Sequence, residues 1–318
     1  MVQFRLDQVD KVEIWTLADN YLDLVSGDNS GIVARAMPVK DMQLTNSILA
    51  EHGFSAIVTT TTKEKPRTML FDFGFSEDVV ARNAAALGVD LTNVELAALS
   101  HGHMDHFGGL AQVGARIGKK GLGLILHPAA FRRNRYVEPI QGIKVRLPAL
   151  EEEKVEASGF KITQAKEPLL LLDGHVLFLG EIPRRTSFEK GLPNAFYEEN
   201  GQKVWDPIED DTAVVTNLGA KGLVVLSGCA HSGIVNTVEY AREITGINKV
   251  HVIMGGFHLT GPAFEPIIDD TVKSIRQIGP DYVIPTHCTG RKATLAIEKA
   301  MSNQFLVNMS GTKLTFVA

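Results

Sequence analysis

The amino-acid sequence predicts a single α/β domain built of layered β-sheets, and three features of the chain support this fold class. Short apolar or β-branched runs recur throughout the 318 residues, and each ends at Gly, Pro, Asn or Asp, as strands do. The first part of the chain is rich in such runs, whereas the last third alternates strands with helices. No linker-like segment separates the two parts, so we expect one domain over residues 1–318.

The elements of the first half follow from hydrophobic periodicity. Residues 78–87 combine helical spacing with many alanines, and Gly88 is a typical helix stop. The polar residues 61–67 separate two β-branched runs, which indicates a hairpin. In chain order we expect strands at residues 11–17, 55–60, 68–73, 94–99 and 122–126, and helices at residues 78–87 and 110–117.

The second half contains one hairpin, one irregular segment and a run of strand–helix units. Asp173-Gly174 is a strong hairpin signal between two apolar runs. Residues 181–211 are rich in Pro, Gly and charge, and a connection of this length in a compact domain indicates a lid-like insert. We expect strands at residues 160–163, 169–172, 176–179, 223–226, 250–254 and 282–284, and helices at residues 234–244, 270–278 and 293–301.

Composition and charge exclude several classes of protein. The formal net charge is −5, so the chain lacks the basic footprint of a nucleic-acid-binding protein. It contains no run of 18 apolar residues that could span a membrane, and residues 1–7 lack the apolar core of a signal peptide. Its two cysteines are too few for a disulfide framework. We therefore expect a cytoplasmic protein with neither nucleic acid nor membrane as a partner.

The most informative motif is His101-Gly-His103-Met-Asp105-His106, between an apolar run and Gly108-Gly109. Three imidazoles so close together repel one another when protonated, and buried polar groups, the carboxylate included, must find partners. A divalent metal solves both problems, because imidazole and carboxylate groups suit zinc, iron or manganese. The motif therefore predicts a metal site.

Three later turns, each after a predicted strand, also carry histidine. They contain Cys229 and His231, then His258, then His287 and Cys288. Loops at strand ends are where rigid scaffolds place chemistry. Two metals about 3.5–4 Å apart need roughly six protein ligands, so these turns would have to complete a dinuclear site.

This arrangement of motifs resembles the metallo-β-lactamase fold superfamily. The match depends on His-x-His-x-Asp-His after a strand, on Asp72 at an upstream strand end, and on Pro285-Thr-His287. It implies an αββα sandwich of two mixed sheets flanked by helices. Four segments resemble the branch of dihydropterin–ribofuranosylaminobenzene phosphate synthases, namely SGCAHSG (227–233), MGGFHL (254–259), PTHCTG (285–290) and GEIPR (180–184).

The resemblance implies a ligand set and two divalent metal ions, with zinc preferred and iron or manganese as alternatives. His101 and His103 would bind the first metal, and His231 is the choice for its remaining histidine. Asp105, His106 and His287 would bind the second. The superfamily usually supplies a bridging Asp after a Gly, but Cys229 stands there, and Cys229, His231 or His258 could each occupy that space. Asp72 is expected to brace the metal loop rather than to touch metal.

The implied function is a metal-dependent hydrolase or transferase that acts on a small, anionic, phosphorylated or heteroaromatic substrate. Metal-bound hydroxide would attack it, or a metal would assist departure of phosphate or pyrophosphate. Catalytic candidates are Asp105 and His231; substrate-binding candidates are Arg184, Arg185, His258 and Arg291. His52 is expected to be structural, although its turn could approach the cleft. Alternatives are a general ester, lactone or phosphodiester hydrolase and a non-catalytic metal-holding binding or sensing protein. The sequence also leaves open whether the chain forms a homo-oligomer.

Overall fold

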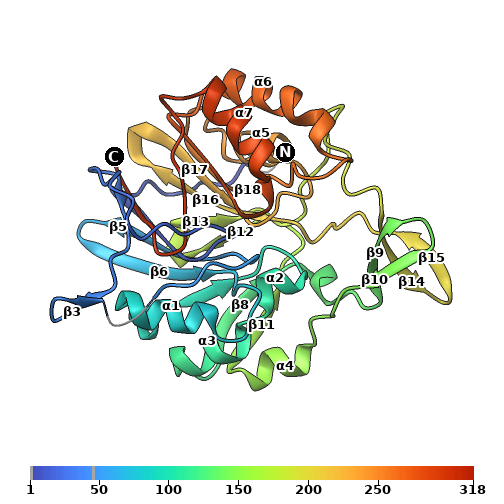
Figure 1. Ribbon diagram of the computed structural model, residues 1–318, viewed down its shortest axis with the longest axis horizontal. Helices are drawn as coiled ribbons and strands as arrows, with labels where there is room; N and C mark the ends of the chain where they lie inside the picture. Colours follow the sequence, from blue (N-terminus) through green and yellow to red (C-terminus); the bar gives the residue numbers. More distant parts are fainter. Residues whose placement is uncertain (1–2, 45–46) are drawn as a thin grey trace.

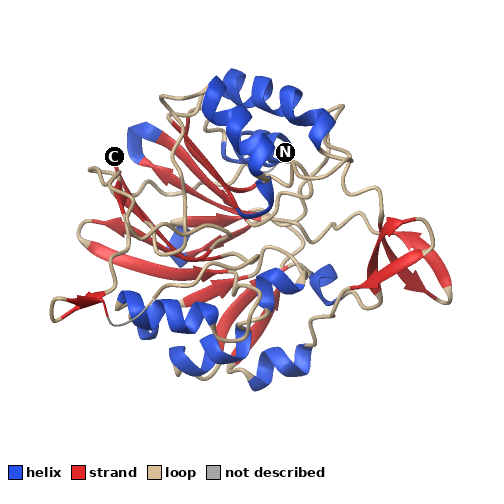
Figure 2. Cartoon of the chain, viewed as in Figure 1, coloured by secondary structure: helices blue, strands red, loops and turns tan. Residues whose placement is uncertain are grey.

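Two β-sheets face each other in the middle of the molecule, and a layer of helices covers the outer face of each sheet (Figure 1; Figure 2). This computed structural model describes residues 3–44 and 47–318, so the first two residues of the N-terminal segment considered above lie outside it. The expected αββα sandwich is confirmed. No helix among the described residues is long and apolar enough to span a membrane.

The first sheet has eight strands and is mixed. Its antiparallel half includes the expected hairpin, which turns at Lys63 and Glu64, and its other half is parallel. Across the sheet, its strands are β11 (Phe160–Gln164), β8 (Leu122–Leu126), β7 (Leu96–Ala98), β6 (Lys65–Phe71), β5 (Ser55–Thr62), β1 (Lys11–Ala18), β20 (Lys313–Val317) and β2 (Val33–Ala34).

The second sheet has six strands and is also mixed. Its first four strands are antiparallel, and the last three run parallel to one another. Its strands, in spatial order, are β12 (Leu169–Leu171), β13 (Val176–Phe178), β16 (Ala213–Leu218), β17 (Gly222–Ser227), β18 (Val250–Gly256) and β19 (Tyr282–Thr286).

Three apolar clusters hold the four layers together. Side chains of both sheets, including Phe71 and Phe178, interdigitate between them. A second cluster packs the first sheet against α1 (Val79–Leu87), α3 (Leu110–Ile117) and α4 (Glu152–Ala157). A third packs the second sheet against α5 (Ile234–Thr245), α6 (Ile268–Ile278) and α7 (Arg291–Ala300). Burial of this apolar surface is the main stabilising term, at about 25 cal/mol per Å².

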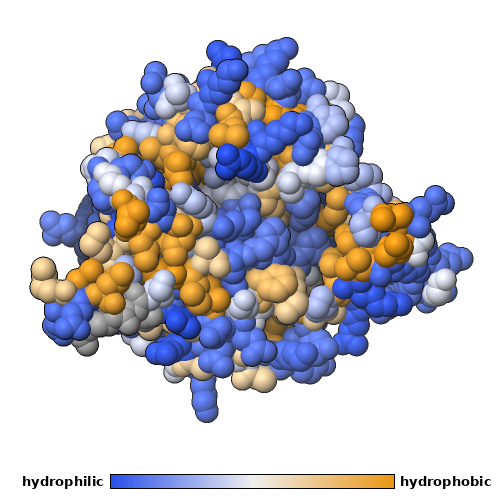
Figure 3. Space-filling model, in the orientation of Figure 1, coloured by the Kyte–Doolittle hydropathy of each residue, from blue (hydrophilic) through white to orange (hydrophobic). Residues whose placement is uncertain are grey.

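A small four-stranded sheet projects from one side of the sandwich (Figure 1), and apolar residues gather over it in Figure 3. Residues 181–211, expected to be an irregular insert, supply two of its strands. Its strands are β10 (Ile143–Arg146), β9 (Arg135–Ile140), β14 (Ala195–Glu199) and β15 (Gln202–Trp205), and a separate pair is β3 (Val39–Lys40) and β4 (Gln43–Leu44).

The parallel strands position the turns that carry the candidate site residues. Because their carboxyl ends share an edge of each sheet, the turns after β6 and β7 meet those after β17, β18 and β19 between the two layers. Four of the described non-glycine residues with a left-handed backbone lie in these turns: Asp72 (φ 61°), Ala230 (φ 48°), His258 (φ 45°) and His287 (φ 46°). Such conformations cost about 1–3 kcal/mol each and cluster at functional sites.

Candidate metal centre

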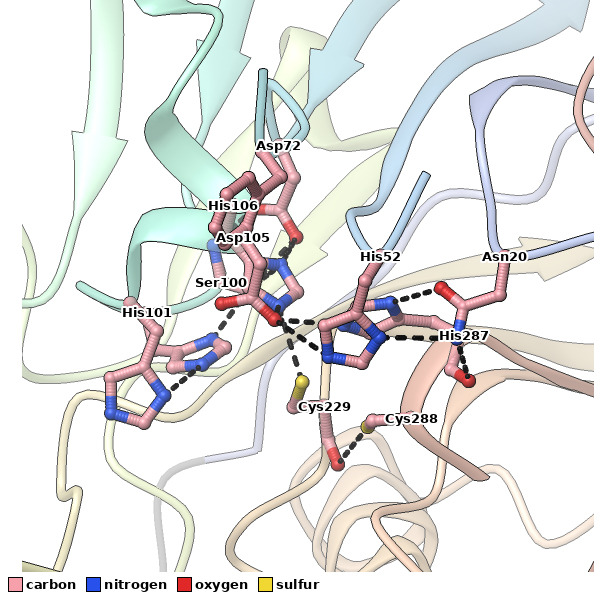
Figure 4. Close-up of polar contacts among 12 residues, drawn as sticks. Asn20, His52, Asp72, Ser100, His101, Asp105, His106, Cys229, His287 and Cys288 are labelled. Carbon is pink, nitrogen blue, oxygen red and sulfur yellow. Dashed lines mark hydrogen bonds and ion pairs between the residues drawn. The ribbon is translucent and has the colours of Figure 1, made fainter. Parts of the chain in front are cut away.

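The His101–His106 motif lies at the end of β7, where the chain turns into the short helix α2 (Met104–Phe107). His101 and His106 are buried, and the Asp105 side chain is 17% exposed. Figure 4 shows side chains from this loop turned toward Cys229 and His287, which come from the second sheet. The structure therefore brings together the residues that the motif predicted and the turns that were expected to complete it.

Asp72 positions the loop through three contacts. Its carboxylate accepts hydrogen bonds from Ser100 N at 2.7 Å and Ser100 Oγ at 2.8 Å. Its Oδ2 also lies 2.7 Å from His106 Nδ1. Burial alone would lower the pKa of His106, but the carboxylates of Asp105 and Asp72 raise it to about 9. Asp72 thus turns Nε2 of His106 toward the centre, as a carboxylate behind a metal-binding histidine does.

His101, His103 and His231 form one half of the cluster. The ring centroid of His231 lies 4.8 Å from that of His101 and 5.0 Å from that of His103. Burial lowers the pKa of all three rings, and that of His103 falls to about 4 with a further contribution from Arg135. These imidazoles are therefore neutral at physiological pH, which is the form that binds metal.

His231 supplies the test of whether a metal fits this half. Neither its Nδ1 nor its Nε2 has a hydrogen-bond partner among the described residues, although the residue is only 4% exposed. Leaving such a polar group buried and unpaired costs roughly 1–3 kcal/mol. A cation bound to one of these nitrogens and to the neighbouring imidazoles removes part of this cost, so the donor set fits a metal of the zinc, iron or manganese type.

Cys229 connects the two halves of the cluster. Its Sγ lies 3.1 Å from His106 Nε2. It belongs to a potential ligand group with Asp105, His106 and His287, and to a second with His101 and His231, in each of which all donor atoms lie within 4.8 Å of one another. Gly228 permits this approach, because a Cβ there would lie 2.1 Å from Ser100 Oγ.

The remaining predicted ligands lie at the ends of β18 and β19. His287 Nε2 is 3.2 Å from Asp105 Oδ2. His258 stacks on His231 with ring centroids 4.3 Å apart, and it forms a third potential ligand group with Cys229 and Cys288. Burial would raise the pKa of Asp105, but His106 and His287 hold it well below its usual range, so the carboxylate is ionised.

Several residues around the cluster were missed in the sequence. Asp210 Oδ2 accepts from Gly102 N at 2.7 Å, and the Asp210 carboxylate pairs with the buried Arg135. Asp211 accepts from Ser232 N at 2.8 Å and thereby holds the turn of His231; its burial raises its pKa to about 6. Both aspartates stand in the segment taken for a lid, and their position directly before the run that forms β16 was the available signal.

Three arginines that were predicted to bind substrate are either exposed or bonded to groups of the protein. Arg184 donates to the backbone oxygens of Pro207 and, at 3.4 Å, His231, so it supports the His231 turn instead of presenting a free guanidinium fork. Arg185 is exposed and paired with Glu243. Arg291 is exposed at the start of α7, and its role as an anion contact stays a prediction.

Comparison with known proteins adds sequence and fold relatives. The sequence model of the metallo-beta-lactamase superfamily matches residues 64–288. The 7,8-dihydropterin-6-methyl-4-(β-D-ribofuranosyl)-aminobenzene-5'-phosphate synthase of Methanocaldococcus jannaschii is 31% identical over 294 residues, which cover 91% of each chain. An uncharacterised protein of the same archaeon is 31% identical over 250 residues, covering 77% of this chain and 86% of that protein.

Solved structures agree with this assignment. A metal-dependent hydrolase of the β-lactamase superfamily superposes with a TM-score of 0.73 and 26% identity, covering 96% of this chain and 100% of that chain. The metallo-β-lactamase fold protein YhfI of Bacillus subtilis superposes with a TM-score of 0.50 and 12% identity over 96% and 100% of the two chains, which is a likeness of fold alone.

Proposed function

The chain belongs to the metallo-β-lactamase superfamily of metal-dependent enzymes, and on that premise we propose that it holds two divalent metals and acts as a dihydropterin–ribofuranosylaminobenzene phosphate synthase. The identity of 31% to the named synthase over nine-tenths of both chains supports the substrate class. The site itself supports the dinuclear centre.

One observation carries the dinuclear part of the proposal, and it is the position of Cys229 between two groups of donors. In the superfamily this place is usually filled by an Asp that bridges two metals. Here the Cys229 sulfur is within reach of both groups, so it can serve as the shared ligand. His101, His103 and His231 would hold one ion, Asp105, His106 and His287 the other. Zinc suits this mixture of imidazole, carboxylate and thiolate, with iron or manganese as alternatives.

In the proposed reaction, the amine of a ribofuranosylaminobenzene phosphate attacks the methylene carbon of a dihydropterin methyl diphosphate. A carbon–nitrogen bond forms, the carbon–oxygen bond to diphosphate breaks, and the amine loses one proton. When bound, the metals supply Lewis-acid stabilisation of the charge that develops on the departing diphosphate. Because Asp105 stays ionised and is partly exposed, we place the attacking N–H against its carboxylate, which orients the nucleophile.

The protein also contributes rigidity. Asp72 fixes the ring of His106, Asp211 fixes the turn of His231, and Asp210 fixes Gly102. Groups held in this way need little reorganisation during the reaction, and such preorganisation is a large part of electrostatic catalysis. His258, beside His231 and partly exposed, is placed to contact the substrate.

A plain hydrolase is the second candidate, and the likeness to a solved metal-dependent hydrolase at 26% identity favours it. In that case water replaces the amine, and the same residues act on an ester, lactone or phosphodiester. The two candidates differ in what the reaction requires, because only the synthase needs the aromatic amine.

The experiment follows diphosphate release from the dihydropterin methyl diphosphate, with and without the ribofuranosylaminobenzene phosphate. The synthase proposal predicts stoichiometric release with a joined product only when both substrates are present. Equal release without the amine would identify a hydrolase. No release under either condition, together with turnover of bis(4-nitrophenyl) phosphate, would reject the synthase and keep a phosphodiesterase.

A further inference from the structure

A further imidazole, that of His52, lies beside the cluster but belongs to none of its potential ligand groups. Its side chain is 64% exposed, yet Nε2 lies 3.8 Å from Asp105 Oδ2. Its ring centroid is 4.9 Å from that of His287. Figure 4 shows the His52 ring next to His287 and turned toward Asp105. The ring therefore faces solvent and cluster together, as a side chain that meets a bound substrate would.

The turn that carries His52 is fixed by its neighbours. The Glu51 carboxylate accepts from the backbone N–H groups of Phe75 at 2.9 Å and Ser76 at 2.8 Å. On the other side, Phe54 N donates to the backbone oxygen of Asp105 at 3.1 Å. Both flanks of His52 are thus tied to the metal loop and its surroundings, so the exposed ring has a set position. A ligand that meets it loses little binding energy to ordering.

Asn20, two residues after the end of β1, determines the tautomer of His287. Asn20 Nδ2 donates to the backbone oxygen of His287 at 2.9 Å, and since a carbonyl only accepts, this contact settles which amide atom is nitrogen. Asn20 Oδ1 is then the atom 3.2 Å from His287 Nδ1, so that ring nitrogen carries the proton. In the neutral ring, Nε2 of His287, 3.2 Å from Asp105 Oδ2, then carries a lone pair and is suited to be a ligand.

The same amide determines the tautomer of His52. Asn20 Nδ2 lies 3.2 Å from His52 Nδ1, and because an amide nitrogen only donates, Nδ1 is the acceptor. A neutral His52 therefore carries its proton on Nε2. At 3.8 Å from Asp105 this N–H is too far for a hydrogen bond, and no other described residue accepts from it. The Asn20 amide thus leaves a lone pair on Nε2 of His287 and an N–H donor without an acceptor on Nε2 of His52.

We propose that His52 is a catalytic residue whose Nε2–H donates a hydrogen bond to a phosphate or diphosphate oxygen of the substrate at the cluster, and that Asn20 is the positioning residue that selects this tautomer. The anion part rests on the proposed function, because metals at the cluster would bring the anion there. The tautomer part rests on the chain alone, so the two parts can fail separately.

The first test is nitrogen-15 NMR of the histidine rings in metal-free protein at about pH 8, above the ordinary histidine pKa. Wild-type His52 is expected to show an unprotonated Nδ1 and a protonated Nε2. In Asn20→Asp, an acceptor faces Nδ1 and the proton should move to Nδ1. Asn303→Asp, an exposed site elsewhere, is the matched control and should leave His52 unchanged. A wild-type His52 protonated on Nδ1 would overturn the assignment of Asn20.

The second test measures metal content and the affinity of metal-loaded protein for inorganic phosphate and pyrophosphate. His52→Ala is expected to retain full metal content and to lose about tenfold in anion affinity, as for a hydrogen bond to a charged group. His52→Gln, whose amide nitrogen reaches a similar place, should recover most of that loss. His175→Ala, a histidine near Thr60, is the control and should match wild type. Stronger loss for pyrophosphate than for phosphate would point to the diphosphate as the group that His52 contacts.

The outcomes separate the two proposals. Unchanged anion affinity in His52→Ala, with normal binding by wild type, rejects the contact of His52 and leaves the proposed function intact. Loss of metal in His52→Ala makes His52 a ligand and rejects its role as donor. If the wild-type protein binds neither anion, the proposed function and the anion role of His52 are both rejected, whatever the NMR shows about Asn20.

Discussion

Cys229 Sγ lies 3.1 Å from His106 Nε2, and His106 Nδ1 lies 2.7 Å from the Asp72 carboxylate. This chain of contacts runs from the first sheet, through one imidazole, to the strand end of the second sheet. Cys229 therefore lies between two potential donor groups and can be a ligand shared by both.

Replacement of Cys229 should remove the ligand that the two donor groups share. In Cys229→Ala we expect metal content to fall by about one equivalent, because each donor group loses a ligand and the second ion has no bridge. Cys229→Asp restores a carboxylate and should keep both ions. With cobalt, wild type should show a sulfur-to-metal charge-transfer band that Cys229→Asp lacks. A Cys229→Ala protein that still binds two ions would show that the thiol is no ligand.

Metal binding should release protons from the group that contains His106 and Cys229. His106 has a pKa of about 9, and burial raises the pKa of the Cys229 thiol above its ordinary value, so both are protonated near neutral pH. Each must lose its proton to bind metal, whereas His101, His103 and His231 are already neutral, so about two protons should be released per chain when both ions bind at about pH 7.5. Apparent affinity should therefore rise with pH, and rise less steeply above about 9, where the His106 contribution ends and only the thiol still contributes.

Calorimetry in buffers of different ionisation enthalpy measures this release. Cys229→Asp should release about one proton, because its carboxylate is already ionised and only His106 contributes. Metal uptake by wild type without proton release would mean that neither residue becomes a ligand.

Asp72 should control the affinity of the same ion without touching it. Asp72→Asn keeps the shape of the side chain but removes the charge that faces His106 Nδ1. Loss of such a carboxylate behind a metal-binding histidine typically lowers metal affinity 10–100-fold. Competition with a chelating dye measures the change. Asp173→Asn, at an 80% exposed carboxylate on the surface, is the control and should match wild type.

His103 should be necessary for metal but not for the fold. His103→Ala is expected to abolish uptake of the first ion and turnover, because that group would retain only His101, His231 and the shared thiol. Its free energy of unfolding without metal should change by no more than about 1–2 kcal/mol, since the ring is only partly buried. Denaturation in chelator measures the second quantity, and full activity in this variant would refute the ligand set.

Much of the fold could be predicted because periodicity in this chain is strong where parallel strands are buried. β8, α3 and β18 illustrate this, since uninterrupted apolar runs or helical spacing end at a glycine or a histidine turn. The strands of the projecting sheet were missed because they are short and largely open to solvent. In β10 apolar and polar residues alternate over only four positions, and all four are exposed. β20 was missed because its partner β1 is almost 300 residues away.

The site was predictable where ligands are close in sequence and only partly where they are not. The ligands from His101 to His106 form a motif within six residues, and His287 follows a predicted strand. The contacts of Asn20 with His52 and His287 depend on loops that meet only in the folded chain, and no local pattern predicts them. The buried pair of Arg135 with Asp210 was likewise hidden, because its two residues are 75 positions apart in the sequence.

Metal content per chain, measured on protein purified without added metal or chelator, tests the central claim most directly. We expect about two equivalents of zinc, iron or manganese in wild type and about one in Cys229→Ala, because the thiol would be shared by two donor groups. One equivalent or less in wild type, unchanged by loss of the thiol, would contradict a dinuclear centre bridged by Cys229.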